Sequence, residues 1–302
     1  MDVLVFGAGA MGSFFGGLLS LRNEVTLIGR KDHMDAVRAH GLRIMGKTVR
    51  LVRPHTATRV PKGSHPELVI VATKSYDTAA AMRSLRPFAG TALFLTLQNG
   101  LDNADLIARD AKRVIAGTTA HGVTFLGPGE IRHAGVGDTT IGAWAGVNEA
   151  AVVRVRDLLE EAGIRTRVTA DARSELWAKL VVNAAINPLA ALAGVPNGRL
   201  VADPNLRRLL EDVARETAAV ARAAGARVDP DDLVRRTRLV ARRTASNRAS
   251  MLQDLDRARP TEIDAITGAV LREAERTGRD APLNRALFAL VKARETPFER
   301  GS

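Results

Sequence analysis

The 302-residue sequence predicts an α/β protein in which a parallel-sheet domain, residues 1–169, is followed by an all-α domain, residues 170–302. Three observations lead to this prediction. Short apolar runs alternate with helical patterns in the first domain, a glycine-rich turn follows the first of those runs, and helical periodicity fills the chain from residue 171 to residue 295. The length suits two domains of roughly 100–200 residues each.

Five apolar runs rich in β-branched residues predict the strands of the first domain. Such continuous runs are typical of strands that are buried on both faces, as in a parallel sheet covered by helices. Segments 41–52 and 122–135 predict two hairpins, the second with a Gly-Pro-Gly turn. The predicted strands are residues 2–6, 24–28, 68–72, 92–97 and 114–118.

The second domain shows the helical period almost throughout, with glycine and proline at its joints. The cleft between a sheet domain and a helical domain is a favoured place for a ligand, so we expect the site there. The predicted helices are residues 175–191, 204–224, 230–258, 262–276 and 283–293.

The composition excludes several classes of site. The chain has no cysteine, which removes disulfides, thiolate nucleophiles, iron–sulfur clusters and cysteine-type zinc sites. Its six histidines show no metal-ligand spacing, so no metal is expected. We find no signal peptide and no apolar stretch near the ~20 residues of a membrane helix. We therefore expect a soluble, cytoplasmic protein without a membrane partner.

The net charge of +11 raises the question of nucleic-acid binding. The basic excess is spread evenly, with 21 Lys and Arg against 15 Asp and Glu in residues 1–168, and 23 against 18 in the remainder. There is no basic tail and little interleaving of aromatic residues. This pattern favours a positive electrostatic potential that attracts anionic cofactors and substrates, rather than a nucleic-acid-binding surface.

A glycine loop directly after the first predicted strand indicates a Rossmann-type dinucleotide site. Gly7, Gly9 and Gly12 have the G-x-G-x-x-G spacing and open a predicted helix. The first glycine turns the chain, the second admits a pyrophosphate to the backbone, and the third permits close packing of helix and strand. The alternative is a glycine turn without a ligand. The predicted cofactor loop is Gly7, Ala8, Gly9, Ala10, Met11 and Gly12.

Cations after the second predicted strand favour NADP over NAD. NAD-selective folds place Asp or Glu there for the ribose hydroxyl, whereas this chain has Arg30 and then Lys31. Arg30 is therefore predicted to bind the 2′-phosphate. Asp32 is close enough in the sequence to bind the ribose hydroxyl of NAD instead. Arg30 could also be an ordinary solvated arginine without a ligand, so NAD stays open as the alternative. Lys74 follows the third predicted strand, at the sheet edge where ligands bind in such folds.

A polar stripe interrupts the apolar helix predicted over residues 175–191. Lys179, Asn183 and Asn187 lie at i, i+4 and i+8, within about 80° of one another around the helix. Unpaired, each buried polar group would cost roughly 1–3 kcal/mol, so a polar partner such as a substrate is expected opposite them. Alternatively, the asparagines bond to neighbouring helices and the lysine reaches solvent.

A second polar set occurs near the C-terminus. Asn247 and Ser250 are expected as i, i+3 neighbours on one helix, and Glu262 begins the next. A carboxylate in a first helical turn is also simply a favourable start for that helix, so Glu262 has a structural alternative.

Taken together, these segments resemble the ketopantoate reductase (2-dehydropantoate 2-reductase) family over essentially the whole chain. The matching pieces are GAGAMG, ATKSYDT, LQNG, GDTTIG, KLVVNAAINP, GVPNG and SMLQDLDRARPTEID. The last is specific to the family, whereas the glycine loop is shared by dinucleotide-binding domains in general.

The resemblance implies NADPH-dependent reduction of ketopantoate to (R)-pantoate, a step towards pantothenate and coenzyme A. It implies that Lys179 is the general acid and that Glu262 acts with it in catalysis. It also implies that Asn99 and Glu262 contact the cofactor. The implied substrate residues are Asn99, Asn183, Asn187, Asn197, Asn247 and Ser250.

The chemistry agrees with these roles. Hydride transfer to a ketone leaves negative charge on the oxygen, so a proton donor is needed there. Burial lowers the pKa of a lysine and the neighbouring Glu262 raises it, and the two effects together could tune Lys179 as that donor. Two alternatives stay open: a related reductase of another 2-keto acid or opine-type adduct, and a catalytically silent NADP-sensing module. The oligomeric state also stays open between monomer and homodimer, because an amphipathic helical domain can pack on a second copy.

Overall fold

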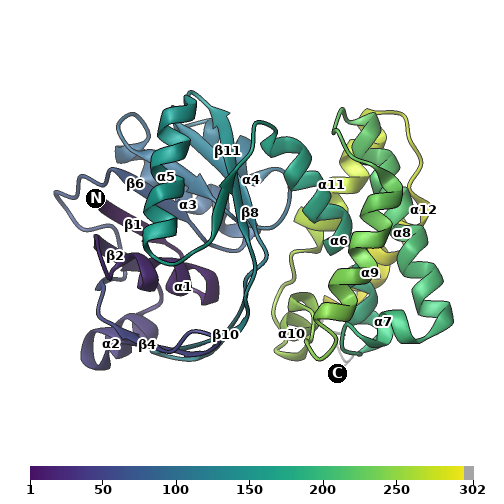
Figure 1. Ribbon diagram of the computed structural model, residues 1–302, viewed down its shortest axis with the longest axis horizontal. Helices are drawn as coiled ribbons and strands as arrows, with labels where there is room; N and C mark the ends of the chain where they lie inside the picture. The colour runs from purple at the N-terminus through teal and green to yellow at the C-terminus, as the bar shows by residue number, and fades with distance from the viewer. Residues whose placement is uncertain (296–302) are drawn as a thin grey trace, which may run out of the picture. The chain divides into compact units, whose positions relative to one another are not determined.

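A computed structural model describes residues 1–295 and divides the chain into two compact units (Figure 1). Unit 1 comprises Met1–Gln98 and Asp102–Glu175, and unit 2 comprises Asn99–Leu101 and the chain from Leu176 onward. The two units are described separately below. The predicted class, a parallel-rich sheet domain followed by a helical domain, is confirmed.

Unit 1 is built on an eight-stranded sheet with the order β12-β11-β8-β7-β6-β1-β2-β5. The pairs are parallel except β11 with β8, which is antiparallel. β1 lies between β2 and β6, so the carboxyl ends of these three strands meet at one edge. The strands are β1 (Asp2–Phe6), β2 (Glu24–Ile28), β5 (His55–Ala57), β6 (Leu68–Val71), β7 (Leu93–Thr96), β8 (Val114–Thr119), β11 (Thr139–Ala145) and β12 (Thr166–Val168).

Helices cover both faces of this sheet because its strands are apolar on both sides. Val3 and Val5 of β1 belong to one core with α1 and α5, while Leu4 belongs to another core with α3 and α4. The helices of unit 1 are α1 (Ala10–Leu19), α2 (Lys31–His40), α3 (Thr78–Leu85), α4 (Asn103–Ala108) and α5 (Glu149–Glu161), with short 3₁₀ turns at Ser75–Asp77 and Arg86–Phe88.

The two predicted hairpins are confirmed, and they combine into a second sheet. β3 (Leu42–Gly46) and β4 (Arg50–Val52) form one hairpin, and β9 (Gly122–Gly127) and β10 (Glu130–Gly135) form the other. β3 pairs in parallel with β10, which gives the order β4-β3-β10-β9. β5, β11 and β12 were not predicted.

Unit 2 is helical and has its own core. That core is formed mainly by apolar residues of α6, α8 and α11. Its helices are α6 (Ala172–Ala193, which begins within unit 1), α7 (Arg199–Ala202), α8 (Pro204–Ala223), α9 (Pro230–Arg243), α10 (Ser250–Asp256), α11 (Ile263–Arg276) and α12 (Pro282–Glu295).

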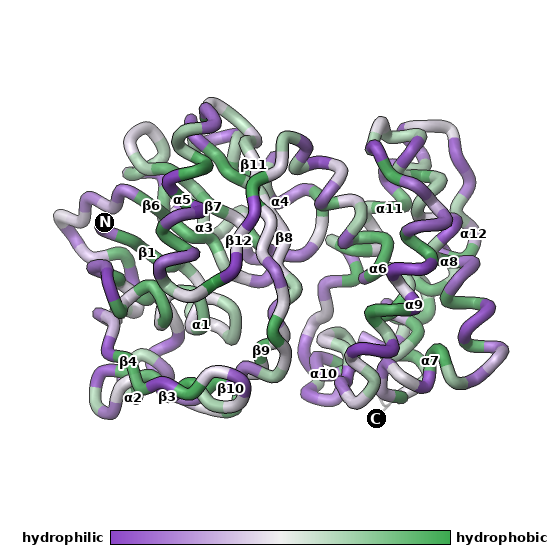
Figure 2. Tube along the Cα trace, in the orientation of Figure 1, coloured by the Kyte–Doolittle hydropathy of each residue, from purple (hydrophilic) through white to green (hydrophobic). Residues whose placement is uncertain are grey.

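One expectation about hydropathy is wrong. By length and composition α6, with 22 residues, is apolar enough to cross a membrane, and it appears green over much of its length in Figure 2. Most of this apolar stretch is buried inside the protein. Its apolar residues are therefore accounted for by packing in the core of a helical unit.

The predicted continuous helix over residues 230–258 is also wrong. α9 ends at Arg243 and α10 begins at Ser250, so Asn247 lies in a loop and Ser250 opens the next helix. The cause is long-range: the backbone carbonyls of Ala245 and Asn247 accept hydrogen bonds from the N–H groups of Gly198 and Asn197. These bonds hold the loop in a non-helical conformation.

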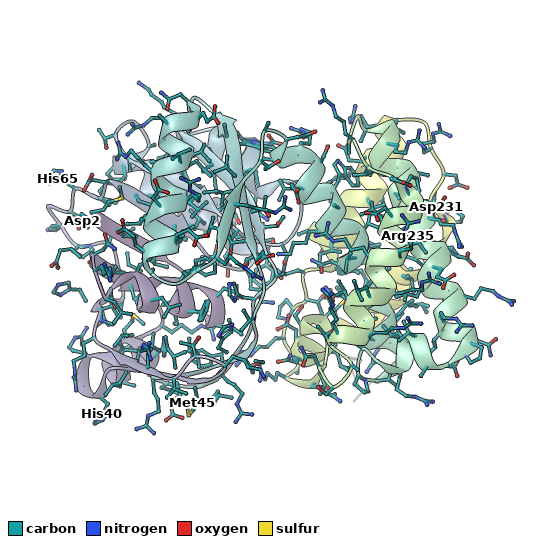
Figure 3. The ribbon with its side chains drawn as sticks, viewed as in Figure 1. Asp2, His40, Met45, His65, Asp231 and Arg235 are labelled. Atoms are coloured by element: carbon teal, nitrogen blue, oxygen red, sulfur yellow. The ribbon has the colours of Figure 1, made fainter. Side chains whose placement is uncertain are left out.

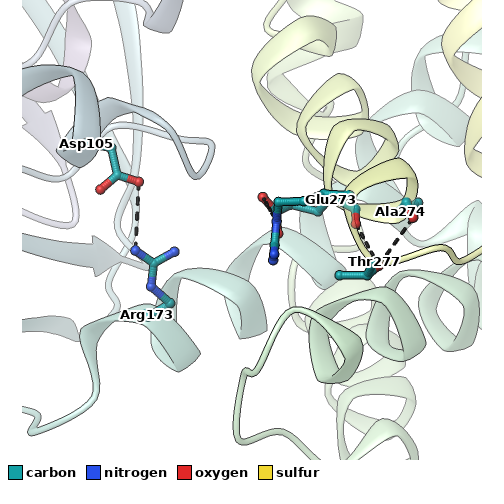
Figure 4. Close-up of polar contacts among 6 residues, drawn as sticks. Asp105, Arg173, Glu273, Ala274 and Thr277 are labelled. Atoms are coloured by element: carbon teal, nitrogen blue, oxygen red, sulfur yellow. Dashed lines mark hydrogen bonds and ion pairs between the residues drawn. The ribbon is translucent and has the colours of Figure 1, made fainter.

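Several surface charges form ion pairs with nearby residues. Asp231 and Arg235, on α9, are labelled in Figure 3, and Arg235 pairs with Asp232 at 3.2 Å. At the start of α6, Arg173 lies over the ring of Trp144 and within 3.8 Å of Asp105, the ion pair drawn in Figure 4. Each of these contacts offsets the charge of one arginine locally.

Candidate active site

The glycine loop joins β1 to α1 by a turn that only glycine fits. Gly7 has φ of +104°, and a Cβ there would lie 2.6 Å from the amide nitrogen of Thr73. A Cβ on Gly12 would lie 2.2 Å from the carbonyl oxygen of Gly7. Both glycines are therefore required by the fold itself.

Gly9 differs from these two glycines. A Cβ on Gly9 would meet no described atom within 4 Å, and Gly9 is the N-cap of α1 without a side-chain cap. The first N–H groups of a helix lack intrahelical acceptors and attract anions. The loop Gly7–Gly12 thus offers an open, donor-rich cradle that fits a dinucleotide pyrophosphate.

Arg30 and Lys31 stand at the adjoining strand end. Arg30 is the exposed N-cap of α2, two residues after β2 ends at Ile28. Lys31 pairs with Asp35 at 2.5 Å on the same helix. Of the two cations, Arg30 is therefore the better placed to meet a ligand.

Lys74 lies three residues after the end of β6, in a segment that a buried glutamine stabilises. The side-chain amide of Gln98 donates to the carbonyl oxygen of Thr73 at 2.9 Å and to the hydroxyl of Thr78 at 2.9 Å. Thr96 in turn donates to Oε1 of Gln98 at 2.9 Å. These bonds tie together the residues that follow the carboxyl ends of β6 and β7, and so shape the edge from which Lys74 extends.

In unit 2 the polar stripe of α6 lies on the predicted helix. Lys179 and Asn183 are half-buried and Asn187 is 7% exposed, among neighbours that are mostly buried and apolar. Asn187 precedes Pro188, which lacks the N–H that would bond one turn back.

Asn99 links the stripe to Glu262. Its Oδ1 accepts from Nδ2 of Asn183 at 3.5 Å, and its own Nδ2 donates to Oε2 of Glu262 at 3.1 Å. Glu262 is the buried N-cap of α11, 7% exposed. The structure therefore brings together three predicted residues from three separate segments.

Lys179 completes this group electrostatically. Burial lowers the pKa of its ammonium from 10.5 to about 8, and the negative charge of Glu262 opposes that shift. A lysine in this range is still charged at neutral pH, yet gives up its proton more readily than an exposed lysine. The arrangement suits a proton donor for a developing oxyanion.

A second group contains Asn197 and Asn247. Asn197 is 7% exposed, and its backbone N–H donates to the carbonyl oxygen of Asn247 at 3.0 Å. Ser250 is exposed at the start of α10. Asn187 and Ser250 have no hydrogen bond to either group among the contacts of residues 1–295.

Comparison with known proteins identifies the family. Residues 3–146 match the family described as ketopantoate reductase PanE/ApbA, and residues 171–295 match its C-terminal domain. The chain is 43% identical over 298 residues to the 2-dehydropantoate 2-reductase of Halobacterium salinarum, covering 97% of this chain and 98% of that protein. It is 37% identical to that of Pyrococcus abyssi, covering 98% of each.

This chain belongs to the ketopantoate reductase family.

Solved structures agree with the ketopantoate reductase fold. The PanE/ApbA family ketopantoate reductase from Ralstonia eutropha JMP134 matches with a TM-score of 0.89 at 34% identity, covering 98% of each chain. D-mandelate dehydrogenase in a ternary structure with NADH and anilino(oxo)acetate matches with a TM-score of 0.92 at 26% identity, also covering 98% of each chain. The architecture is thus shared by a reductase and a dehydrogenase that are named for different substrates.

Two residues of the polar groups described above were not predicted from the sequence. Gln98 carries the polar network after β7, and its signal was a glutamine between a buried strand and a glycine turn, flanked by threonine. Thr244 contacts Asn197 at 2.9 Å, and no local pattern marks it because its partner is 47 residues away.

Proposed function

We propose that this protein reduces 2-dehydropantoate (ketopantoate) to (R)-pantoate with NADPH, a reaction of pantothenate and coenzyme A synthesis in the cytoplasm. The observation that carries the proposal is the half-buried Lys179, with its pKa lowered to about 8 by desolvation, in electrostatic contact with Glu262 and on the same helix face as the asparagines of an otherwise apolar helix.

Lys179 acts as the general acid in this proposal. When bound, the nicotinamide cofactor would supply the hydride for the C2 carbon of the substrate. Negative charge then develops on the ketone oxygen, and Nζ of Lys179 donates a proton to it. Because the pKa of Lys179 is about 8, most of the enzyme carries the proton at pH 7.

Glu262, oriented by Asn99, keeps the side chain of Lys179 protonated in this proposal. The carboxylate of Glu262 raises the pKa of Lys179 against the effect of burial, which keeps the ammonium charged. The Asn99 amide donates to Glu262 and accepts from Asn183, which orients both partners. We assign Asn183, Asn187, Asn197, Asn247 and Ser250 to the substrate, with Ser250 at its carboxylate.

The cofactor is a nicotinamide dinucleotide, and we propose NADP(H) as the preferred form. The open space at Gly9 and the first N–H groups of α1 fit the pyrophosphate. Arg30 would bind the 2′-phosphate, because its guanidinium can form two parallel hydrogen bonds to phosphate oxygens. Lys74, Asn99 and Glu262 are assigned to the remainder of the cofactor.

The test is NADPH oxidation with ketopantoate beside other 2-keto acids, with NADH for comparison. Ketopantoate with NADPH should give the highest kcat/KM. Lys179→Ala should lower kcat by about 100-fold or more while leaving NADPH affinity unchanged. The matched control is Lys292→Ala, which removes a lysine paired with Asp264 and Glu295 on the helical surface. Faster turnover of another 2-keto acid would contradict the substrate assignment, and near-normal turnover by Lys179→Ala would contradict the general-acid role.

A further inference from the structure

The side-chain amide of Asn197 has a defined orientation, and Thr244 sets it. Oγ1 of Thr244 lies 2.7 Å from the carbonyl oxygen of Val240, to which it donates its only proton. Oγ1 also lies 2.9 Å from the amide nitrogen of Asn197. Since the hydroxyl proton is already used, Thr244 can only accept from Asn197, and the NH₂ end of the amide must face it.

The opposite end of the same amide is then a fixed acceptor. Oδ1 of Asn197 is buried and has no hydrogen-bond partner among the described residues. An unmade hydrogen bond at a buried oxygen is costly, and native proteins satisfy most such atoms. This oxygen therefore calls for a donor from outside the chain.

Backbone hydrogen bonds fix the position of the loop that carries Asn197. The N–H groups of Asn197 and Gly198 donate to the carbonyl oxygens of Asn247 and Ala245, both at 3.0 Å. A Cβ on Gly198 would lie 2.7 Å from the Cβ of Ala245, so the two loops approach each other closely. Asn197 thus lies in a pair of hydrogen-bonded loops together with Asn247, a residue assigned to the substrate.

The chemistry of the substrate identifies the donor. At neutral pH ketopantoate presents acceptor oxygens at its carboxylate and its ketone, and its single O–H donor is the C4 hydroxyl. We propose that Thr244 is a specificity-determining positioning residue, which holds Oδ1 of Asn197 as the acceptor for the C4 hydroxyl of the substrate. This inference rests on the proposed function, since it takes ketopantoate as the substrate.

The test compares ketopantoate with 3,3-dimethyl-2-oxobutanoate, the analogue in which hydrogen replaces the C4 hydroxyl. Thr244→Val keeps the shape of the side chain and removes its oxygen, whereas Thr244→Ser keeps the hydroxyl. We expect the wild-type enzyme to prefer ketopantoate in kcat/KM. We expect Thr244→Val to lose about 10-fold of that preference, mainly through a higher KM for ketopantoate, and Thr244→Ser to retain it.

Thr277 offers a matched control. It is the C-cap of α11, as Thr244 is of α9, and its Oγ1 donates to the carbonyl oxygen of Glu273 at the same 2.7 Å (Figure 4). Thr277→Val should leave the preference for the hydroxylated substrate unchanged. A merely structural loss in Thr244→Val would lower kcat/KM for both substrates equally.

The remaining outcomes would contradict either the role of Thr244 or the proposed function. An unchanged preference in Thr244→Val, or a wild-type enzyme that treats both substrates alike, overturns the role of Thr244 while the proposed function stands. A wild-type enzyme that reduces neither substrate overturns the proposed function and this inference with it.

Discussion

The amide nitrogen of Asn99 donates to Oε2 of Glu262 at 3.1 Å, although 163 residues separate the two in the chain. Asn99 follows the strand β7, and Glu262 caps the helix α11. The contact holds a buried carboxylate in the group that contains Lys179. The carboxylate that raises the pKa of Lys179 is therefore held by a contact between two distant segments.

Replacing Glu262 by Gln should shift the pH dependence of turnover. Glu262 raises the pKa of Lys179, so its neutralisation should lower that pKa below about 8. A general acid must be protonated, hence the alkaline fall of kcat should move to lower pH. The measurement is kcat against pH from 6 to 10. Glu273→Gln, on the same helix, should leave the profile in place, and an unmoved profile in Glu262→Gln would contradict the coupling.

Arg30→Ala should weaken NADPH binding by about 10-fold or more, since charge-assisted hydrogen bonds to phosphate are among the stronger polar contacts. NADH, which lacks the 2′-phosphate, should bind as before. Fluorescence titration of each nucleotide measures both Kd values. The control is Arg154→Ala, which removes an exposed arginine of α5. Equal losses for both nucleotides would show that Arg30 does not read the phosphate.

Gln98→Leu should destabilise the protein by about 1–3 kcal/mol. The change removes the amide that bonds to Thr73, Thr78 and Thr96, leaving buried polar groups without partners. Urea unfolding gives the loss in free energy of unfolding. Gln253→Ala, which removes a bond to one backbone carbonyl, should cost less. A loss in Gln98→Leu no larger than this control would mean that the network adds little stability.

Acidification should destabilise the protein through its buried histidines. His121 contacts His133 and Phe14, and Asp138 and Arg165 also act on its charge; burial foremost lowers its pKa from 6.5 to about 4. The unfolded chain therefore binds a proton at higher pH than the folded protein does. The free energy of unfolding should fall as pH drops from about 6.5 to 4.

The Tm measured from pH 7.5 to pH 4.5 tests this expectation. His33 and His133 have pKa values lowered by burial as well, so they add to the effect in the same direction. His121→Gln should flatten the dependence, whereas His40→Gln, at an exposed position on α2, should not. A Tm that stays constant over this range in the wild type would refute the sign of the effect.

Local patterns predicted most of the fold and part of the site. The period of 3.6 placed Lys179 and Asn183 on one helix face, and the order strand, glycine loop, helix placed Gly7–Gly12 correctly. The break between α9 and α10 escaped prediction, because bonds from Asn197 and Gly198 cause it. β11 was missed for a related reason: its antiparallel pairing with β8 depends on tertiary context. The contact between Asn99 and Glu262 also has no local signature.

Gly9 carries a different kind of constraint from its two neighbours in the loop. Alanine at Gly7 or Gly12 would collide with backbone, whereas alanine at Gly9 would enter open space with an ordinary φ of −81°. Within residues 1–295 no contact therefore requires glycine at position 9, whereas a ligand lying against the loop would. A side chain at residue 9 would therefore interfere with nucleotide binding and leave folding intact, which separates the two requirements within one short loop.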